Sequence, residues 1–233
     1  GGGRVAGGGR HAREHDEHTE SDGDPVPVDH ARSRSSATIL GLDNFSYRDD
    51  SCLNDEIRIL RVCWIIQSKG LEYLIDAMKI MVDEGYNVVL DIVGEAKSQF
   101  YKETIIKKIN DLNLDGRINI LGWVQTSKIE QYFIGSDIHV ISSLAEGTPR
   151  VIIEGASKGL PLVATNVGGM SNTLVNKVEA LLVNPSSADE LAQAIILLIK
   201  NKDLRKKLIK NGYKMAKEFS FENYVPKISR IID

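Results

Sequence analysis

Two carboxylates stand close together in the segment SSLAEGTPRVIIEGASKGLPLVAT, which follows an apolar run at residues 137–141. Glu146 falls in a polar loop, and Glu154 follows eight residues later, just over one turn into a predicted helix. A carboxylate can accept two hydrogen bonds from sugar hydroxyls, so the pair suits a hydroxyl-rich ligand. The spacing alone is weak evidence, because a helical glutamate is usually solvated. Its meaning therefore depends on the surrounding residues.

The residues between these glutamates suit an anionic ligand. Gly147 lets the backbone approach a bound group closely, and Pro149 suits the first turn of a helix. The free N–H groups of that turn, near Arg150 and Val151, carry a partial positive charge and could bind a diphosphate. Arg150 adds a charge if it turns inward, and a solvated arginine is the equal alternative.

Two other loops repeat this combination of glycine and charge. Lys69 precedes a predicted helix at residues 70–84, where its ammonium could neutralise a diphosphate, although such a lysine is usually solvated. Gly168 and Gly169 follow an apolar run at residues 161–165 and permit a phosphate or sugar to approach the backbone. A lone Gly-Gly pair is more often a simple turn.

The loop LGWVQTS offers a different kind of contact. The backbone groups of Gly122, Trp123 and Val124 could hydrogen-bond the edge of a nucleobase, and the indole could stack or pack on the base. The alternative, given equal weight, is that Trp123 only covers the edge of a sheet. The loop is thus a candidate base-binding site.

The segments between these loops predict the fold. From Glu56 onward, short runs rich in Val, Ile and Leu alternate with segments of helical periodicity, which predicts βα units on a parallel sheet. Such a sheet binds ligands at the carboxyl ends of its strands, so the candidate loops should lie at one edge. The predicted strands are residues 57–66, 87–93, 117–121, 137–141, 161–165 and 180–183. The predicted helices are residues 70–84, 98–112, 127–135, 149–159, 188–200, 202–217 and 221–232. In the first helix the predicted buried stripe is Leu71, Leu74, Ile75, Met78 and Val82.

Composition narrows the classes of function. The 29 Lys+Arg and 32 Asp+Glu residues nearly balance, which points to neither nucleic acid nor an anionic membrane surface as a partner. No apolar stretch approaches the roughly 18–20 residues that span a bilayer, and the sequence begins without the apolar core of a signal peptide. Two cysteines, Cys52 and Cys63, fit a reducing cytosol, with Cys63 as a buried thiol. We expect a cytoplasmic protein, with peripheral membrane contact left open.

Residues 1–37 differ from the remainder. They are rich in Gly, Ser and charge and poor in large apolar side chains, which predicts a disordered tail or an artefact of expression or of the gene fragment. His11, His15 and His18 have spacings that could chelate a metal, but without an ordered frame they are expected to be solvated. Residues 38–233 are expected to form one domain.

Seven segments, in order, resemble the C-terminal domain of the retaining glycosyltransferases of family 4, which have the GT-B architecture. The resemblance runs from about Thr38 to Arg230 and rests on TILGLDNF, SKGLEYLIDA, DIVGE, LGWV, SDIHVISS, EGTPRVIIEGASKGLPLVAT and the Gly-Gly loop. It implies the C-terminal half of a GT-B fold, a single Rossmann-like α/β domain whose parallel sheet of about six strands is flanked by helices.

The resemblance also implies a donor site for a nucleotide-diphosphate sugar, with a UDP-sugar favoured and with no metal or other cofactor. Glu146 would contact the donor sugar and Lys69 the diphosphate, as the catalytic residues, while Glu154 would contact the ribose hydroxyls. Transfer would retain the anomeric configuration, and hydrogen bonding by Glu146 is favoured over nucleophilic attack. The remaining substrate-binding residues would be Gly147, Thr148, Pro149, Arg150, Val151, Gly168, Gly169, Gly122, Trp123 and Val124.

Three departures from the family pattern matter. Cys63 and Trp64 stand where the family usually has Gly-Arg, so the second diphosphate cation is missing from its usual place, and Arg61 is the candidate substitute. Asn172 stands where a glutamate often follows the Gly-Gly loop, and GEAKS stands where a Gly-x-Gly turn often follows DIVG. These departures affect individual contacts and leave the predicted fold unchanged.

The family places its acceptor site on an N-terminal Rossmann domain, and nothing before Thr38 could fold into one. We expect half of a hexosyltransferase-like enzyme, inactive alone, whose glycan, lipid or small-molecule acceptor binds the missing domain. The alternative is a non-catalytic nucleotide-sugar-binding subunit or relic that needs a separate partner. Epimerisation and phosphorolysis are disfavoured, because no pattern for an epimerase base or a pyridoxal phosphate lysine occurs and His139 is expected to pack mid-strand.

Overall fold

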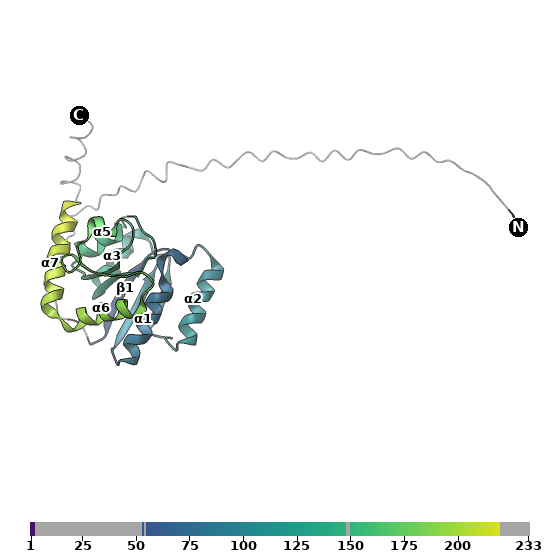
Figure 1. Ribbon diagram of the computed structural model, residues 1–233, viewed down its shortest axis with the longest axis horizontal. Coiled ribbons are helices and arrows are strands. Elements are labelled where there is room, and N and C mark those ends of the chain that lie inside the picture. The colour runs from purple at the N-terminus through teal and green to yellow at the C-terminus, as the bar shows by residue number, and fades with distance from the viewer. Residues whose placement is uncertain (3–52, 54, 148–149, 220–233) are drawn as a thin grey trace, which may run out of the picture. The chain divides into compact units, whose positions relative to one another are not determined.

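Six parallel strands form the centre of the part that the structure describes (Figure 1). This computed structural model describes residues 1–2, 53, 55–147 and 150–219. The strand order is β3-β2-β1-β4-β5-β6, so the chain builds outward from β1 to β3 and then returns to β4 on the other side of β1. The strands are β1 (Ile57–Val62), β2 (Val88–Val93), β3 (Ile118–Gly122), β4 (Ile138–Ile141), β5 (Leu162–Thr165) and β6 (Ala180–Val183). The predicted α/β fold with about six parallel strands is confirmed.

Helices cover both faces of this sheet (Figure 1). The helices α1, α2 and α6 share one apolar cluster with the sheet, while α3 and α4 pack on the opposite face. The last described helix, α7, packs against α4 and α6. Their bounds are η3 (Gln67–Lys69), α1 (Leu71–Asp83), α2 (Gln99–Asp111), α3 (Thr126–Ile134), α4 (Arg150–Ser157), α5 (Met170–Thr173), α6 (Ala188–Lys200) and α7 (Lys202–Glu218).

Burial explains why the strands are almost continuously apolar. Every residue of β2, β4 and β5 is buried, because both faces of the sheet are covered. Successive residues then enter different clusters: Val163 packs with α1 and α6, whereas Leu162 and Ala164 pack with α4. Alternate residues of one strand thus pack against the helices on opposite faces of the sheet.

Short polar side chains set the starts of three helices. Ser98, Ser187 and Asn201 each accept a hydrogen bond from a backbone N–H in the first turn of α2, α6 and α7 respectively. Arg205 of α7 is buried and donates from Nη1 to the carbonyls of Leu198 and Ile199, at the end of α6. This guanidinium therefore satisfies carbonyls that the end of a helix leaves without partners.

The observed structure differs from the prediction in several places, and part of the prediction lies outside the described residues. β1 ends at Val62 instead of residue 66. The chain bends at Cys63, whose carbonyl group packs against Gly94 in the loop that follows β2. Met81, and not Val82, completes the fully buried stripe of α1, since Val82 is only partly buried. The short helix α5 was not predicted. The predicted helix at 221–232 lies outside the described residues, as do Cys52, the three tail histidines and residues 3–37 of the predicted tail.

Membrane insertion finds no support in the described helices, each of which falls short of the length and apolar character needed to cross a bilayer. Cys63 is a free thiol, as expected, but it is only partly buried; this partial burial still raises its pKa.

His139 packs in the core at the middle of β4, as its position in the sequence predicts. The side chain is 1% exposed, meets the Phe133 ring edge-on at 5.5 Å between centroids, and has no hydrogen-bond partner on either ring nitrogen. A methyl group added at Gly155 would lie 2.5 Å from its Nδ1, so the glycine lets α4 approach the sheet here. Burial, and then the charge of Arg61, lower the pKa of His139 to about 3.

This buried imidazole predicts a loss of stability in mild acid. Below about pH 6.5, His139 binds a proton in the unfolded chain but stays neutral in the folded one. The contribution of His139 to the free energy of unfolding is therefore complete above that pH and falls as the pH is lowered toward 3. Between pH 6.5 and 5.0 the free energy of unfolding should drop by about 2 kcal/mol through this residue. Urea titrations of the wild type and of His139→Leu at both pH values measure the difference. An equal drop in both proteins would contradict the assignment.

Candidate functional site

The loops at the carboxyl edge of the sheet are packed together through glycines. A methyl group at Gly94 would lie 1.8 Å from the Cys63 carbonyl oxygen, and one at Gly70 would lie 2.2 Å from the Ser142 carbonyl oxygen. At Gly168 it would lie 1.9 Å from the carbonyl oxygen of Glu146. These contacts join the loops after β2, β1, β4 and β5 in the order in which the strands lie in the sheet. The candidate loops therefore form one continuous surface.

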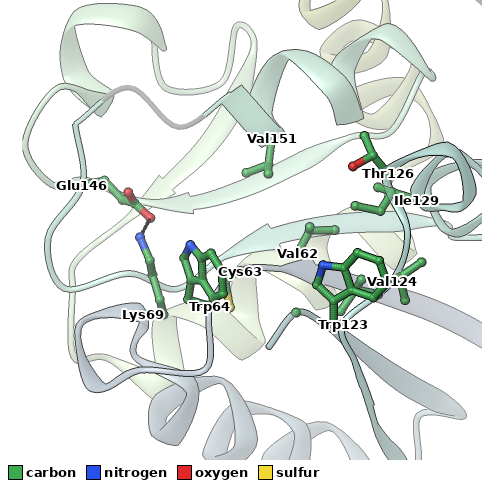
Figure 2. Close-up of a pocket in the computed structure, with 12 residues that line it drawn as sticks. Val62, Cys63, Trp64, Lys69, Trp123, Val124, Thr126, Ile129, Glu146 and Val151 are labelled. Carbon is green, nitrogen blue, oxygen red and sulfur yellow. Dashed lines mark hydrogen bonds and ion pairs between the residues drawn. The ribbon is translucent and has the colours of Figure 1, made fainter. Parts of the chain in front are cut away.

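A pocket of about 320 Å³ opens on this surface (Figure 2), at the carboxyl ends of the neighbouring strands β1 and β4, between which the strand order in the sheet reverses. An open α/β sheet binds ligands at such a switch point. Lys69 and Glu146 lie at one end, and Trp123, Val124 and Ile129 lie at the other (Figure 2). The lining residues are Val62, Cys63, Trp64, Lys69, Val93, Gly94, Trp123, Val124, Thr126, Ile129, Glu146 and Val151. The pocket is ionic at one end and apolar at the other.

Lys69 and Glu146 form an ion pair at the charged end. The Lys69 Nζ lies 2.6 Å from Glu146 Oε1, and the two side chains are only 17% and 11% exposed. Ser143 Oγ donates to the same carboxylate oxygen at 2.7 Å. Among the described residues, Glu146 Oε2 makes no hydrogen bond, which leaves it for the hydroxyl of a ligand. The pair thus combines a cation and a free acceptor in one small space.

Arg61 does not supply the second cation at the pocket. Its side chain is fully buried beneath the site, and its Nη2 donates to Ser143 Oγ at 2.7 Å. A guanidinium with no exposed surface cannot meet a ligand in the pocket. The interpretation of Arg61 as a substitute diphosphate ligand is therefore wrong: as a β1 residue its side chain enters the core, while Lys69 lies at the end of the short helix η3, beyond the strand, and lines the pocket.

Two exposed tryptophans border the pocket. Trp64 is 45% exposed beside the Lys69–Glu146 pair, and Trp123 is 69% exposed at the apolar end (Figure 2). The Lys97 Nζ lies 3.5 Å from the centroid of the Trp64 ring, a cation–π contact. Exposed indoles at a pocket offer flat apolar surfaces on which a planar ring can stack.

Glu154 lies one helical turn beyond Val151 on α4. Val151 lines the pocket, and residues three apart share a helix face, so Glu154 lies beside it without lining the pocket itself. Burial raises the pKa of the Glu154 carboxyl, and the nearby charge of Arg150 opposes that shift. Arg150 itself is exposed at the start of α4.

The other predicted site residues have varied positions. Trp123 and Val124 line the pocket, and Gly122 ends β3 with its carbonyl accepting from the Gly94 N–H at 2.8 Å. Gly147 has open space around it, as a close approach by a ligand requires. Thr148 and Pro149 lie outside the described residues.

The Gly-Gly loop has a structural role that the sequence did not suggest. Gly168 adopts φ +51° beneath the Glu146 backbone, and the Gly169 N–H donates to the Glu146 carbonyl at 3.3 Å. Neither glycine lines the pocket. In this structure the two residues support the loop that carries Glu146.

Thr126 and Ile129 of α3 line the pocket and were not predicted. Their only signal was position, since Thr126 lies within the LGWVQTS segment and Ile129 comes two residues after it. In the described part of the chain, no cluster of three His, Cys, Asp or Glu side chains is arranged to hold a metal ion.

The chain is similar to known proteins in both sequence and fold. The family model described as glycosyl transferases group 1 matches residues 47–215. An uncharacterized glycosyltransferase of Methanocaldococcus jannaschii is 30% identical over 168 residues, which cover 72% of this chain and 45% of that protein. The chain therefore spans less than half the length of this curated relative.

Two solved structures show the same fold. Anabaena HepE, solved in complex with UDP and glucose, is 25% identical with a TM-score of 0.71, over 76% of this chain and 48% of that one. The C-terminal domain of the group 1 glycosyl transferase LpcC from Francisella tularensis is 21% identical with a TM-score of 0.63, over 75% of this chain and 91% of that one. The second likeness bears on the fold alone.

Proposed function

We propose, from the premise that this chain belongs to the glycosyl transferases group 1 family, that its pocket binds the nucleotide-diphosphate sugar donor of a retaining glycosyltransferase of family 4. A UDP-sugar is the favoured donor, as HepE was solved with UDP and glucose. The acceptor is held by a second domain, and transfer takes place when the two domains close. No metal or other cofactor takes part.

The observation that carries this proposal is the polarity of the pocket. A nucleotide sugar has an anionic diphosphate between an aromatic base and a hydroxyl-rich sugar. Lys69 suits the diphosphate, Glu146 Oε2 suits a sugar hydroxyl, and the surface around Trp123 suits a base. The ligand would lie along the pocket from its charged end to its apolar end.

The chemistry of transfer assigns Lys69 a larger role in the transition state than in binding. As the bond from the anomeric carbon to the diphosphate breaks, the electron pair leaves with the diphosphate, and negative charge grows on its oxygens. An ammonium fixed beside them stabilises that charge, helped by the partial positive charge of the helix dipole at the start of α4. Glu146 orients the sugar, the acceptor oxygen forms the new bond to the anomeric carbon, and the proton of the acceptor hydroxyl passes to an oxygen of the departing diphosphate.

Calorimetric titration of the chain with UDP, GDP and ADP tests the proposal. We expect one nucleotide to bind, and Glu154→Ala to weaken it about tenfold through loss of a ribose contact. The same variant should leave 2′,3′-dideoxy-UDP unaffected if UDP is that nucleotide, because the contact needs the ribose hydroxyls. Glu103→Ala, at an exposed position of α2, is the matched control. Failure of a folded chain to bind any nucleotide would refute the donor-site proposal.

A further inference from the structure

Arg61 is an unusual residue for the inside of a sheet. Its side chain has no exposed surface, and its Nε lacks a hydrogen-bond partner. Among the described residues, no carboxylate lies within ion-pairing distance of it, and Ser143 Oγ is the acceptor that it reaches. A buried charge without a direct counter-ion is costly, so such a residue calls for a functional explanation.

The hydroxyl of Ser143 connects Arg61 to the pocket. Because Arg61 Nη2 donates to Ser143 Oγ at 2.7 Å, the single hydroxyl proton is directed away from the guanidinium. It points to Glu146 Oε1, also 2.7 Å away. The Glu146 carboxylate thus accepts two hydrogen bonds. One comes from the buried hydroxyl of Ser143, which follows β4 and is held by Arg61 of β1, and the other comes from the ammonium of Lys69.

These three charged groups leave the site with an excess positive charge. Lys69 and Arg61 each carry one positive charge, and Glu146 carries one negative charge. When its ammonium also faces a diphosphate, Lys69 divides its three donors between two anions, which weakens its hold on Glu146. The bond from Ser143 does not compete in this way, because its donor is buried beneath the carboxylate.

We propose that Arg61 and Ser143 are positioning residues for Glu146, which hold its Oε1 in place when Lys69 turns to the donor diphosphate, so that Oε2 stays directed at the donor sugar. This inference rests on the proposed donor site. It gives Arg61 a role through Ser143 and assigns it no contact with the ligand.

The test separates binding of the nucleotide from binding of its sugar. Dissociation constants for UDP and for UDP-glucose are measured by calorimetry for the wild type, Ser143→Ala, Arg61→Met and Arg61→Lys. We expect Ser143→Ala and Arg61→Met to weaken UDP-glucose about tenfold and UDP less than twofold. Arg61→Lys, which keeps the charge, should recover part of the loss. In a Glu146→Gln background the effect of Ser143→Ala should disappear.

Arg205→Met is the matched control, since it removes another buried arginine whose partners are helix carbonyls away from the pocket. It should leave the ratio of the two dissociation constants unchanged. If Arg61→Met does not fold, the much smaller change Ser143→Ala decides the question. Equal weakening of both ligands, or of neither, overturns the inference. A wild type that binds UDP but not UDP-glucose also overturns it, whereas a wild type that binds no nucleotide refutes the donor site itself.

Discussion

Replacing Lys69 with methionine should weaken the binding of UDP by about 30- to 100-fold, or about 2–3 kcal/mol. Lys69 is the cation at the charged end of the pocket, and its partner Glu146 is only 11% exposed. The variant loses a charge-assisted hydrogen bond to the diphosphate. It also leaves the Glu146 carboxylate unpaired beside an anionic ligand, which adds repulsion.

Calorimetry with UDP and UMP measures this loss of affinity and shows whether it depends on the second phosphate. UMP lacks the second phosphate, so the affinity of Lys69→Met for UMP should stay much closer to that of the wild type. The control is Lys97→Met, which removes a half-exposed lysine that lies over Trp64 and does not line the pocket. Equal losses for UDP and UMP would show that Lys69 does not recognise the diphosphate.

Substituting Gly168 with alanine should lower the free energy of unfolding by about 2–4 kcal/mol and displace Glu146. The new methyl group would lie 1.9 Å from the Glu146 carbonyl oxygen, and the backbone φ of +51° is unfavourable for alanine. Since the atoms that this methyl group would meet belong to the Glu146 backbone, the clash is relieved only by moving one of the two loops. Binding of UDP-glucose should weaken with the loss of stability.

The matched control for Gly168→Ala is Gly122→Ala. Gly122 has a similar φ of +70°, but nothing lies within 4 Å of an added methyl group. The Gly122→Ala variant should therefore lose only the free energy needed to hold alanine at a positive φ, about 1 kcal/mol. Urea unfolding of both variants gives the difference. If the two variants lose equal stability, the close approach of the loops after β4 and β5 is not a constraint.

The two largest predicted effects act from either side on the loop that carries Glu146, through Lys69 after β1 and Gly168 after β5. Lys69 follows β1 and Glu146 follows β4, and the two residues are 77 positions apart in the chain. They meet because β1 and β4 are adjacent in the sheet and because Gly70 lets the first loop pack on Ser142. A change in either loop is expected to alter both.

Local patterns were sufficient for the layers of the fold. The alternation of apolar runs with helical periodicity predicted the strands and most helices of the described chain. This was possible because the hydrophobic period and the length of each segment can be read from neighbouring residues in the sequence. A βα repeat then places the following loops at one edge of the sheet. The sequence could for this reason select the loops of Lys69, Trp123, Glu146 and Gly168 as one site before their partners were known.

These local patterns did not show which residues from distant parts of the chain contact each other. The tertiary structure decided that Arg61 enters the core while Lys69 reaches the pocket, that Gly168 supports the Glu146 backbone, and that Ile129 completes the apolar end. It also decided that Met81 replaces Val82 in the buried stripe of α1.

The physical reason is the same in each case. Secondary structure follows from backbone preferences and periodicity over a few residues, and so the sequence alone determined the elements and the edge of the sheet at which the candidate site lies. The burial and hydrogen bonding of one side chain depend on elements that pack from distant parts of the chain. For Arg61, Lys69 and Gly168 those elements are β4 and its loop, and only the folded sheet brings them together.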